Sequence, residues 1–65
     1  MKITINGEVR ESTATTLAGL IDQLAMKPDR IAVELNRAIV RREHWAATEL
    51  HDGDQLEIVH FVGGG

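Results

Sequence analysis

Two antiparallel strands joined by a tight turn are predicted by the N-terminal stretch KITINGEVRES, residues 2–12. Its two isoleucines alternate with polar residues, which is the period-two pattern of a strand with one buried face. The dipeptide Asn6-Gly7 follows and tolerates the positive φ angles of a type I′ turn, the strongest short hairpin signal. The residues after the turn form the return strand, in which we place Val9 on the core face.

A helix is predicted next, between a cap at Thr15 or Thr16 and a stop at Pro28. A threonine hydroxyl accepts a hydrogen bond from a free N–H of the first turn, and proline lacks an N–H and clashes with the preceding turn. Gly19 should destabilise this helix by about 0.5–1 kcal/mol relative to alanine, and the sequence shows no compensating feature. One apolar stripe lies at the i, i+3, i+4, i+7 spacing: Leu17, Leu20, Ile21 and Leu24.

Three further strands are expected over residues 31–36, 38–40 and 56–61. A helical turn over 42–47 carries the only tryptophan, and the sequence Asp52-Gly53-Asp54 forms a turn before the last strand. A hairpin, a crossover helix and returning strands can bury the helix stripe on one face of a mixed sheet, with the preferred right-handed crossover. The order ββαββ therefore predicts an α+β fold of the β-grasp, or ubiquitin-like, class with one main helix.

The predicted core combines the helix stripe with the inward-facing strand residues and the tryptophan, which we interpret as a core anchor. Its members are Ile3, Ile5, Val9, Leu17, Leu20, Ile21, Leu24, Ile31, Val33, Leu35, Trp45, Leu50, Leu56 and Ile58.

Composition places the chain among small single domains that are stabilised by packing alone. Its 65 residues include no cysteine, 43% are apolar and the formal net charge is −3. The thinly spread basic side chains argue against nucleic-acid binding, and no apolar run approaches the roughly 20 residues that span a bilayer. We expect a cytoplasmic protein, monomeric when free, with a β-grasp domain over residues 1–61 and a flexible tail over 62–65.

The tail contains three of the six glycines of the chain, Gly63, Gly64 and Gly65. A carboxylate on such a side-chain-free stem can enter a narrow active site of another protein. Once an ATP-using partner has adenylated it, a sulfur nucleophile gives a thiocarboxylate, an amine an amide and a thiol a thioester. Glycine suits all three routes because it adds no bulk beside the reacting carbonyl. The sequence therefore indicates a substrate or carrier rather than an enzyme.

Partner contacts are expected on the last strand, directly before the tail. The core-facing phase of this strand begins at Leu56, so Val59 and Phe61 should point to the opposite face. Together with Val62, they are candidates for a partner contact. The alternative is that the segment around Trp45 covers both side chains.

A set of short segments resembles the ThiS family, the small sulfur carrier proteins of thiamine biosynthesis. The resemblance covers nearly the whole chain and depends on the order and spacing of the segments and on the total length. Arg41 departs from the pattern, because the family commonly has proline there. The segments are residues 5–7, 17–24, 33–36, 39–40, 42–45, 50, 52–54, 56–59 and 62–65.

This resemblance implies a carrier that binds no cofactor or metal and turns over no substrate alone. An E1-like adenylyltransferase of the ThiF type would adenylate Gly65 with ATP, and a cysteine desulfurase would supply the sulfur of the thiocarboxylate. A thiazole synthase of the ThiG type would then take the sulfur into the thiazole ring of thiamine. Gly63 and Gly64 would form the threading stem, while Phe61 and Val62 would contact the partners.

Other functions remain open on sequence alone. The small subunit of molybdopterin synthase has the same fold and thiocarboxylate chemistry, although those chains generally run longer and end in two glycines. A β-grasp interaction module with an inert tail and a ubiquitin-like conjugation tag are further alternatives. A metal site is disfavoured, because the spacing of His44, His51 and His60 matches no ligand motif. We expect Asp52 and Asp54 to serve their turn rather than a calcium ion.

Overall fold

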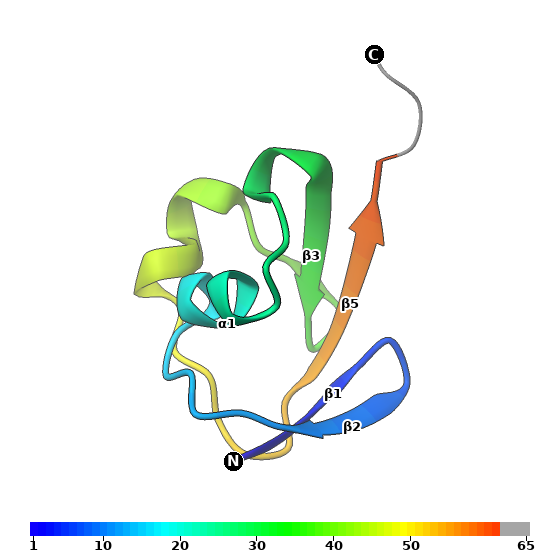
Figure 1. Cartoon of the computed structure of the whole chain (residues 1–65), viewed down its shortest axis with the longest axis vertical. Coiled ribbons are helices and arrows are strands. Elements are labelled where there is room, and N and C mark those ends of the chain that lie inside the picture. Colours follow the sequence, from blue (N-terminus) through cyan, green and yellow to red (C-terminus); the bar gives the residue numbers. More distant parts are fainter. Residues whose placement is uncertain (62–65) are drawn as a thin grey trace.

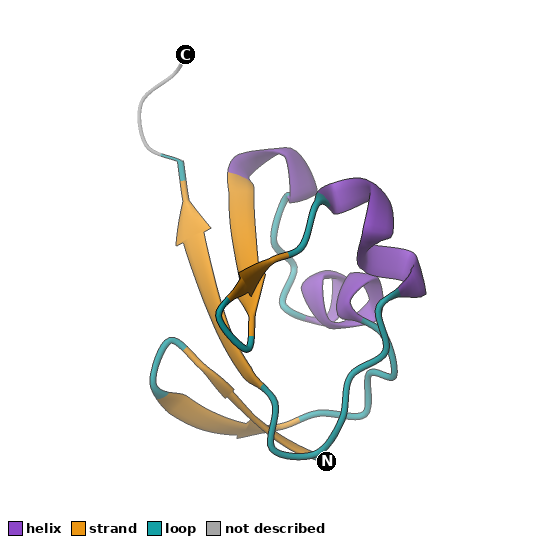
Figure 2. Cartoon of the chain, turned by 180° about the vertical axis from the view of Figure 1, so that it is seen from behind, coloured by secondary structure: helices purple, strands orange, loops and turns teal. Residues whose placement is uncertain are grey.

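The computed structural model describes residues 1–61, in which a five-stranded sheet carries its helices on one face (Figures 1 and 2). The strand order is β2-β1-β5-β3-β4, with β5 parallel to β1 and antiparallel to β3. This mixed sheet with one main helix has the predicted β-grasp arrangement. The elements are β1 (Lys2–Ile5), β2 (Glu8–Glu11), α1 (Leu17–Gln23), η1 (Pro28–Arg30), β3 (Ile31–Leu35), β4 (Ala38–Ile39), η2 (Arg42–Ala47) and β5 (Gln55–His60), where η marks a 3₁₀ helix.

The Asn6-Gly7 turn has the predicted geometry. Its φ angles are 50° and 83°, and Ile5 pairs with Glu8 across it. The Asn6 side chain also contacts β5, because its Nδ2 donates to the Ile58 carbonyl at 3.1 Å and its Oδ1 accepts from the Ile58 N–H at 2.8 Å. This side chain therefore continues the pairing of β5 beyond the end of β1 and fixes the register of the central strand.

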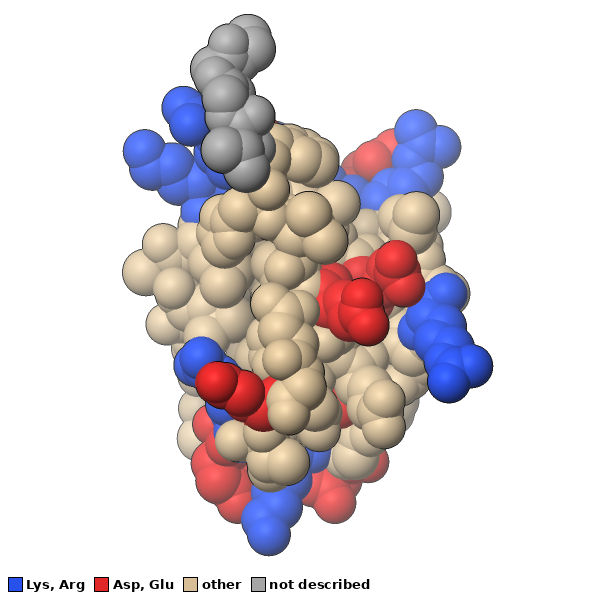
Figure 3. Space-filling view, turned by 90° about the vertical axis from the view of Figure 1, so that its right-hand side faces the viewer, with Lys and Arg blue, Asp and Glu red and all other residues tan. Residues whose placement is uncertain are grey.

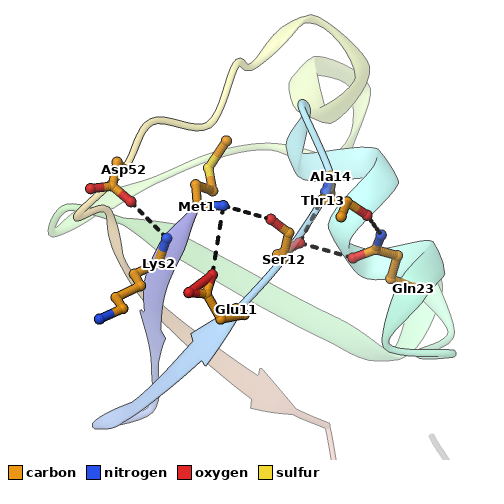
Figure 4. A network of polar contacts seen from close by, with 8 residues as sticks. All are labelled: Met1, Lys2, Glu11, Ser12, Thr13, Ala14, Gln23 and Asp52. Carbon is orange, nitrogen blue, oxygen red and sulfur yellow. Dashed lines mark hydrogen bonds and ion pairs between the residues drawn. The ribbon is translucent and has the colours of Figure 1, made fainter.

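The two aspartates of the 52–54 turn hold backbone and turn groups, as predicted. Asp54 is buried, with its Oδ2 accepting from the His51 N–H at 2.7 Å and its Oδ1 from Asn36 Nδ2 at 3.0 Å. Asp52 Oδ1 accepts from the Lys2 N–H at 2.7 Å (Figure 4). The turn before β5 is thus tied both to the start of β1 and to the β3–β4 turn.

The connection from β2 into α1 is held by hydrogen bonds among its own side chains and one side chain of α1 (Figure 4). Ser12 Oγ donates to Gln23 Oε1 at 2.9 Å, and Gln23 Nε2 donates to Thr13 Oγ1 at 2.8 Å. Ser12 Oγ also accepts from the Ala14 N–H at 3.0 Å, and Ala14 is buried. These bonds fix residues 12–14 against the end of α1, so that the chain reaches the start of the helix in a defined position.

The core agrees with the prediction at most positions. Leu24 and Leu35 are only partly buried, at the margin of the core, and Ala14 is a buried residue that the prediction missed. The predicted residues that are buried are Ile3, Ile5, Leu17, Leu20, Ile21, Ile31, Val33, Trp45, Leu50, Leu56 and Ile58.

The prediction that Val9 faces the core is wrong, since 68% of this residue is exposed. The two-residue turn places Val9 opposite Thr4 and Arg10 opposite Ile3. Residues paired across an antiparallel ladder share a face, so Val9 lies with Thr4 on the outer face. The register that Asn6-Gly7 imposes therefore overrides the apolar character of Val9.

Gly19 has a steric reason that the sequence did not show. Thr16 caps α1, and its Oγ1 accepts from the Gly19 N–H at 3.1 Å. A Cβ at position 19 would lie 3.3 Å from this same oxygen and 3.7 Å from the Ala14 Cβ. Glycine therefore lets the capping hydroxyl approach closely, which offsets part of its low helix propensity.

The end of α1 lies before Pro28, contrary to the prediction that proline stops the helix. Ala25 adopts a left-handed φ of 57°. Its N–H donates to the Asp22 carbonyl at 3.0 Å, and the Met26 N–H donates to the Ile21 carbonyl at 3.3 Å. This is the Schellman pattern, in which a left-handed residue closes the helix. Pro28 instead begins the 3₁₀ helix η1.

Replacing Ala25 by glycine is expected to stabilise the domain. Glycine enters the left-handed region without the steric penalty of a Cβ, and we expect a net gain of about 0.5–1 kcal/mol. Ala25 is exposed, so no cavity results. Urea titration should show a higher midpoint with an unchanged slope. The matched control, Ala18→Gly inside α1, should lower the midpoint; a similar loss in Ala25→Gly would contradict the Schellman assignment.

Candidate functional site

Val59 and Phe61 lie exposed at the end of the central strand β5, on the phase opposite to the core. Each is 58% exposed, whereas Leu56 and Ile58 are 2% and 4% exposed. The predicted orientation of the two side chains is therefore confirmed. Because both side chains are more than half exposed, the alternative in which the segment around Trp45 covers them is wrong.

The pairing of β5 with the β3 side of the sheet continues through Phe61. The Phe61 N–H donates to the Arg30 carbonyl at 2.8 Å, directly after the register pair Ile31 and His60. The predicted site residues Val62, Gly63, Gly64 and Gly65 lie outside the described residues. The chain thus enters this segment from a hydrogen-bonded strand end, at the upper end of β5 in Figure 1.

Two basic side chains, those of Lys27 and Arg30, lie beside this strand end, a feature that the sequence analysis missed. A shallow hollow of about 490 Å³ is lined by Lys27, Arg30, His60 and Phe61, together with the turn that closes α1. The segment 27–30 reaches β5 because Ile31 pairs with His60. An antiparallel pairing between the strand that starts at Ile31 and the strand that ends near His60 would have predicted that residues 27–30 lie close to Phe61.

The outer face of the sheet, opposite the helices, carries an acidic pair that the sequence analysis did not identify. Glu34 and Glu57 are direct partners across β3 and β5, and Ala32 pairs with Val59 two residues nearer the strand end, on the same face. Ile39 of β4 pairs with Glu34 and is 73% exposed. Figure 3 shows acidic side chains gathered within a largely uncharged face, with basic side chains at its margins.

The described residues contain no arrangement typical of catalysis. His44, His51 and His60 are exposed, and Ser12 is engaged with Gln23 and Ala14. Within residues 1–61, no three potential metal ligands are grouped. No helix in the same range is long and apolar enough to cross a membrane.

Comparison with known proteins relates the chain to the ThiS family. The model of the ThiS family matches residues 3–65, which include the C-terminal glycines. The sulfur carrier protein ThiS of Escherichia coli is 33% identical over 66 residues, covering 100% of both chains. The solved structure of the thiamine biosynthesis protein ThiS from Geobacter metallireducens superimposes with a TM-score of 0.85 at 32% identity, again covering 100% of both chains.

A longer relative contains a segment similar to the entire chain. A thiazole synthase of Magnetococcus marinus is 48% identical over 66 residues, and the match covers 100% of this chain but 20% of that protein. The chain therefore spans about a fifth of the length of this relative. Sequence similar to this family occurs within the same polypeptide as a thiazole synthase.

Proposed function

The chain belongs to the ThiS family, and from this premise we propose that it is a sulfur carrier protein of thiamine biosynthesis, a protein co-substrate rather than an enzyme. The observation that carries the proposal is the family match, which extends through Gly65. The exposed pair Val59 and Phe61 directly before the glycines supports it. The names of the relatives, sulfur carrier protein and thiazole synthase, favour the thiamine pathway over the molybdopterin alternative.

The proposed chemistry begins at the Gly65 carboxylate. One carboxylate oxygen attacks the α-phosphorus of ATP in an E1-like adenylyltransferase of the ThiF type and expels pyrophosphate. A desulfurase converts cysteine to alanine and holds the sulfur as a persulfide, from which a thiol reductant releases hydrosulfide as the thiol is oxidised to a disulfide. The hydrosulfide adds to the acyl carbonyl, and the C–O bond to AMP breaks. The products are AMP and a C-terminal thiocarboxylate. This chain contributes the carbonyl and no catalytic side chain.

In the second half of the cycle, sulfur moves from the thiocarboxylate of the carrier to the thiazole precursor. On a thiazole synthase of the ThiG type, the thiocarboxylate sulfur adds to a carbon of the thiazole precursor that is doubly bonded to oxygen or nitrogen, and the π electron pair of that bond moves to the oxygen or nitrogen. Water then cleaves the bond between this sulfur and the Gly65 carbonyl carbon, which restores the carboxylate. The carrier is thereby returned unchanged for another cycle.

The folded body supplies the affinity that the tail lacks. Residues 62–65, when extended, reach at most about 13–14 Å, which is enough to enter a cleft while the body stays outside. Ordering four residues opposes binding by roughly 4–8 kcal/mol of backbone entropy. Contact through Val59 and Phe61, which are exposed next to the tail, would offset this loss by removing apolar surface from water.

Intact-mass measurement tests the carrier chemistry directly. After incubation with the adenylyltransferase, ATP and a sulfur source, we expect a mass gain equal to exchanging one oxygen for one sulfur, mapped to Gly65. The reaction without ATP is the control and should leave the mass unchanged. An unchanged mass with an adenylyltransferase of demonstrated activity would contradict the proposal and favour an inert interaction module.

A further inference from the structure

Two glutamates oppose each other across the middle of the sheet. Glu34 on β3 and Glu57 on β5 are direct register partners on the outer face. Like charges directly opposite across a ladder destabilise a sheet. The ion pairs formed among residues 1–61 involve neither glutamate. The isolated domain therefore gains no stability from this pair, and its position on the two central strands requires another explanation.

Apolar side chains lie beside this acidic pair on β4 and toward the end of β5. Ile39 flanks Glu34 on β4, and Val59 follows Glu57 on the same face of β5. Both are well exposed. We call these four side chains, with Ala32 between them, the acidic sheet face. A partner surface with apolar side chains around one cation has the complementary pattern, because apolar surroundings exclude water from the central charge contact.

A hollow at the acidic sheet face has room for such a cation. It measures about 240 Å³ and is lined by Glu34, Glu57 and Gln55, with Arg37 at the β3–β4 turn. An arginine that enters it can donate to both carboxylates at once, and such charge-assisted bonds are about twice as strong as neutral ones. The described residues offer no third carboxylate or imidazole grouped with the pair, which favours a side-chain cation over a bound metal ion.

The acidic sheet face is continuous with the strand end that leads into the tail. Positions 57, 59 and 61 alternate along one face of the chain, so Glu57 lies about 13 Å before Phe61 at roughly 3.3 Å per residue. A cation held at Glu57 would thus fix the carrier at a defined distance from the point where the tail begins. Such an anchor would set how deeply the tail enters a partner.

We propose that the acidic sheet face docks on the thiazole synthase and receives an arginine or lysine side chain of that enzyme between Glu34 and Glu57. The inference rests on the proposed function. A segment similar to this chain occurs within a thiazole synthase polypeptide, where the carrier-like segment and the rest of the enzyme must stay close. This favours the thiazole synthase as the partner of the acidic sheet face. In this proposal the glutamate pair lowers the free energy of unfolding of the free carrier but strengthens its binding to the enzyme. A purely structural role would instead stabilise the free carrier.

The test combines two measurements on the full chain carrying Glu34→Gln and Glu57→Gln together. Removing the repulsion should raise the thermal midpoint by about 2–4 °C. Calorimetric titration with the thiazole synthase should show binding weakened by roughly 10- to 100-fold, because the cation of the partner loses its carboxylates. The salt dependence of binding should fall as well.

Glu49→Gln is the matched control, because Glu49 is exposed beside the start of α1 and outside the sheet ladder. It should leave the affinity unchanged. Wild-type affinity in the double variant would overturn the inference and leave the proposed function standing. A lower midpoint in the double variant would show that Arg37 already pairs with the glutamates and would also overturn it. Failure of the wild-type carrier to bind the thiazole synthase would remove the proposed function and the inference together.

Discussion

Deleting Gly64 and Gly65 is expected to abolish sulfur transfer completely while the folded body keeps its stability. The truncated stem is shorter by about 7 Å, at roughly 3.3–3.6 Å per residue, so its carboxylate cannot reach the point that Gly65 reaches. None of the buried residues of the described core lies beyond Ile58. Product formation should therefore fall to background, while thermal unfolding of the truncated chain should match that of the full chain.

A second variant separates reach from chemistry. Adding one alanine after Gly65 keeps all three glycines, converts the Gly65 carboxyl into an amide that cannot be adenylated, and moves the free carboxylate one residue further out, by about 3.3–3.6 Å. We expect this variant to retain binding to the adenylyltransferase and to show no mass gain. Sulfur transfer by the truncated chain, or a thiocarboxylate on the added alanine at the wild-type rate, would contradict the role of Gly65.

Local signals predicted the elements of this fold well, because each depends on residues close in sequence. Asn6-Gly7 specified a two-residue turn, and the spacing of Leu17, Leu20 and Ile21 specified the buried face of α1. The end of α1 was missed because it depends on a backbone conformation. Ala25 adopts a positive φ that glycine would have made visible in the sequence. The predicted stop, Pro28, lies three residues after Ala25, the left-handed residue that closes the helix.

Register explains most of what was missed at the surface. The exposure of Val9 follows from its pairing with Thr4, and the acidic pair follows from the alignment of Glu34 with Glu57. Neither alignment can be obtained from one segment alone, because a shift of one residue moves every side chain to the other face. The exposure of Val59 was predictable, since it follows from the apolar phase of a single strand.

Trp45→Ala is expected to destabilise the domain by about 3–5 kcal/mol, the usual range for a large buried side chain. Trp45 is 4% exposed and belongs to the cluster that joins α1, η2 and the sheet. The other aromatic residue, Phe61, is exposed, so no second ring fills this part of the core. Small domains have roughly 0.05–0.15 kcal/mol of stability per residue, which for this chain is about 3–10 kcal/mol, so the variant should be partly or largely unfolded.

Trp45→Phe distinguishes packing from hydrogen bonding at this position. The indole Nε1 donates to the Val40 carbonyl at 2.8 Å, and phenylalanine keeps most of the ring volume without this donor. Leaving a carbonyl without its partner should destabilise the domain by about 1–3 kcal/mol, less than the alanine variant. Urea titration followed by circular dichroism measures both, because tryptophan fluorescence is lost in each.

A loss below about 1 kcal/mol in Trp45→Ala would show that the ring adds little to the core, since truncating a buried aromatic normally removes several kcal/mol. The body of the carrier would then depend mainly on the helix stripe and the inward face of the sheet.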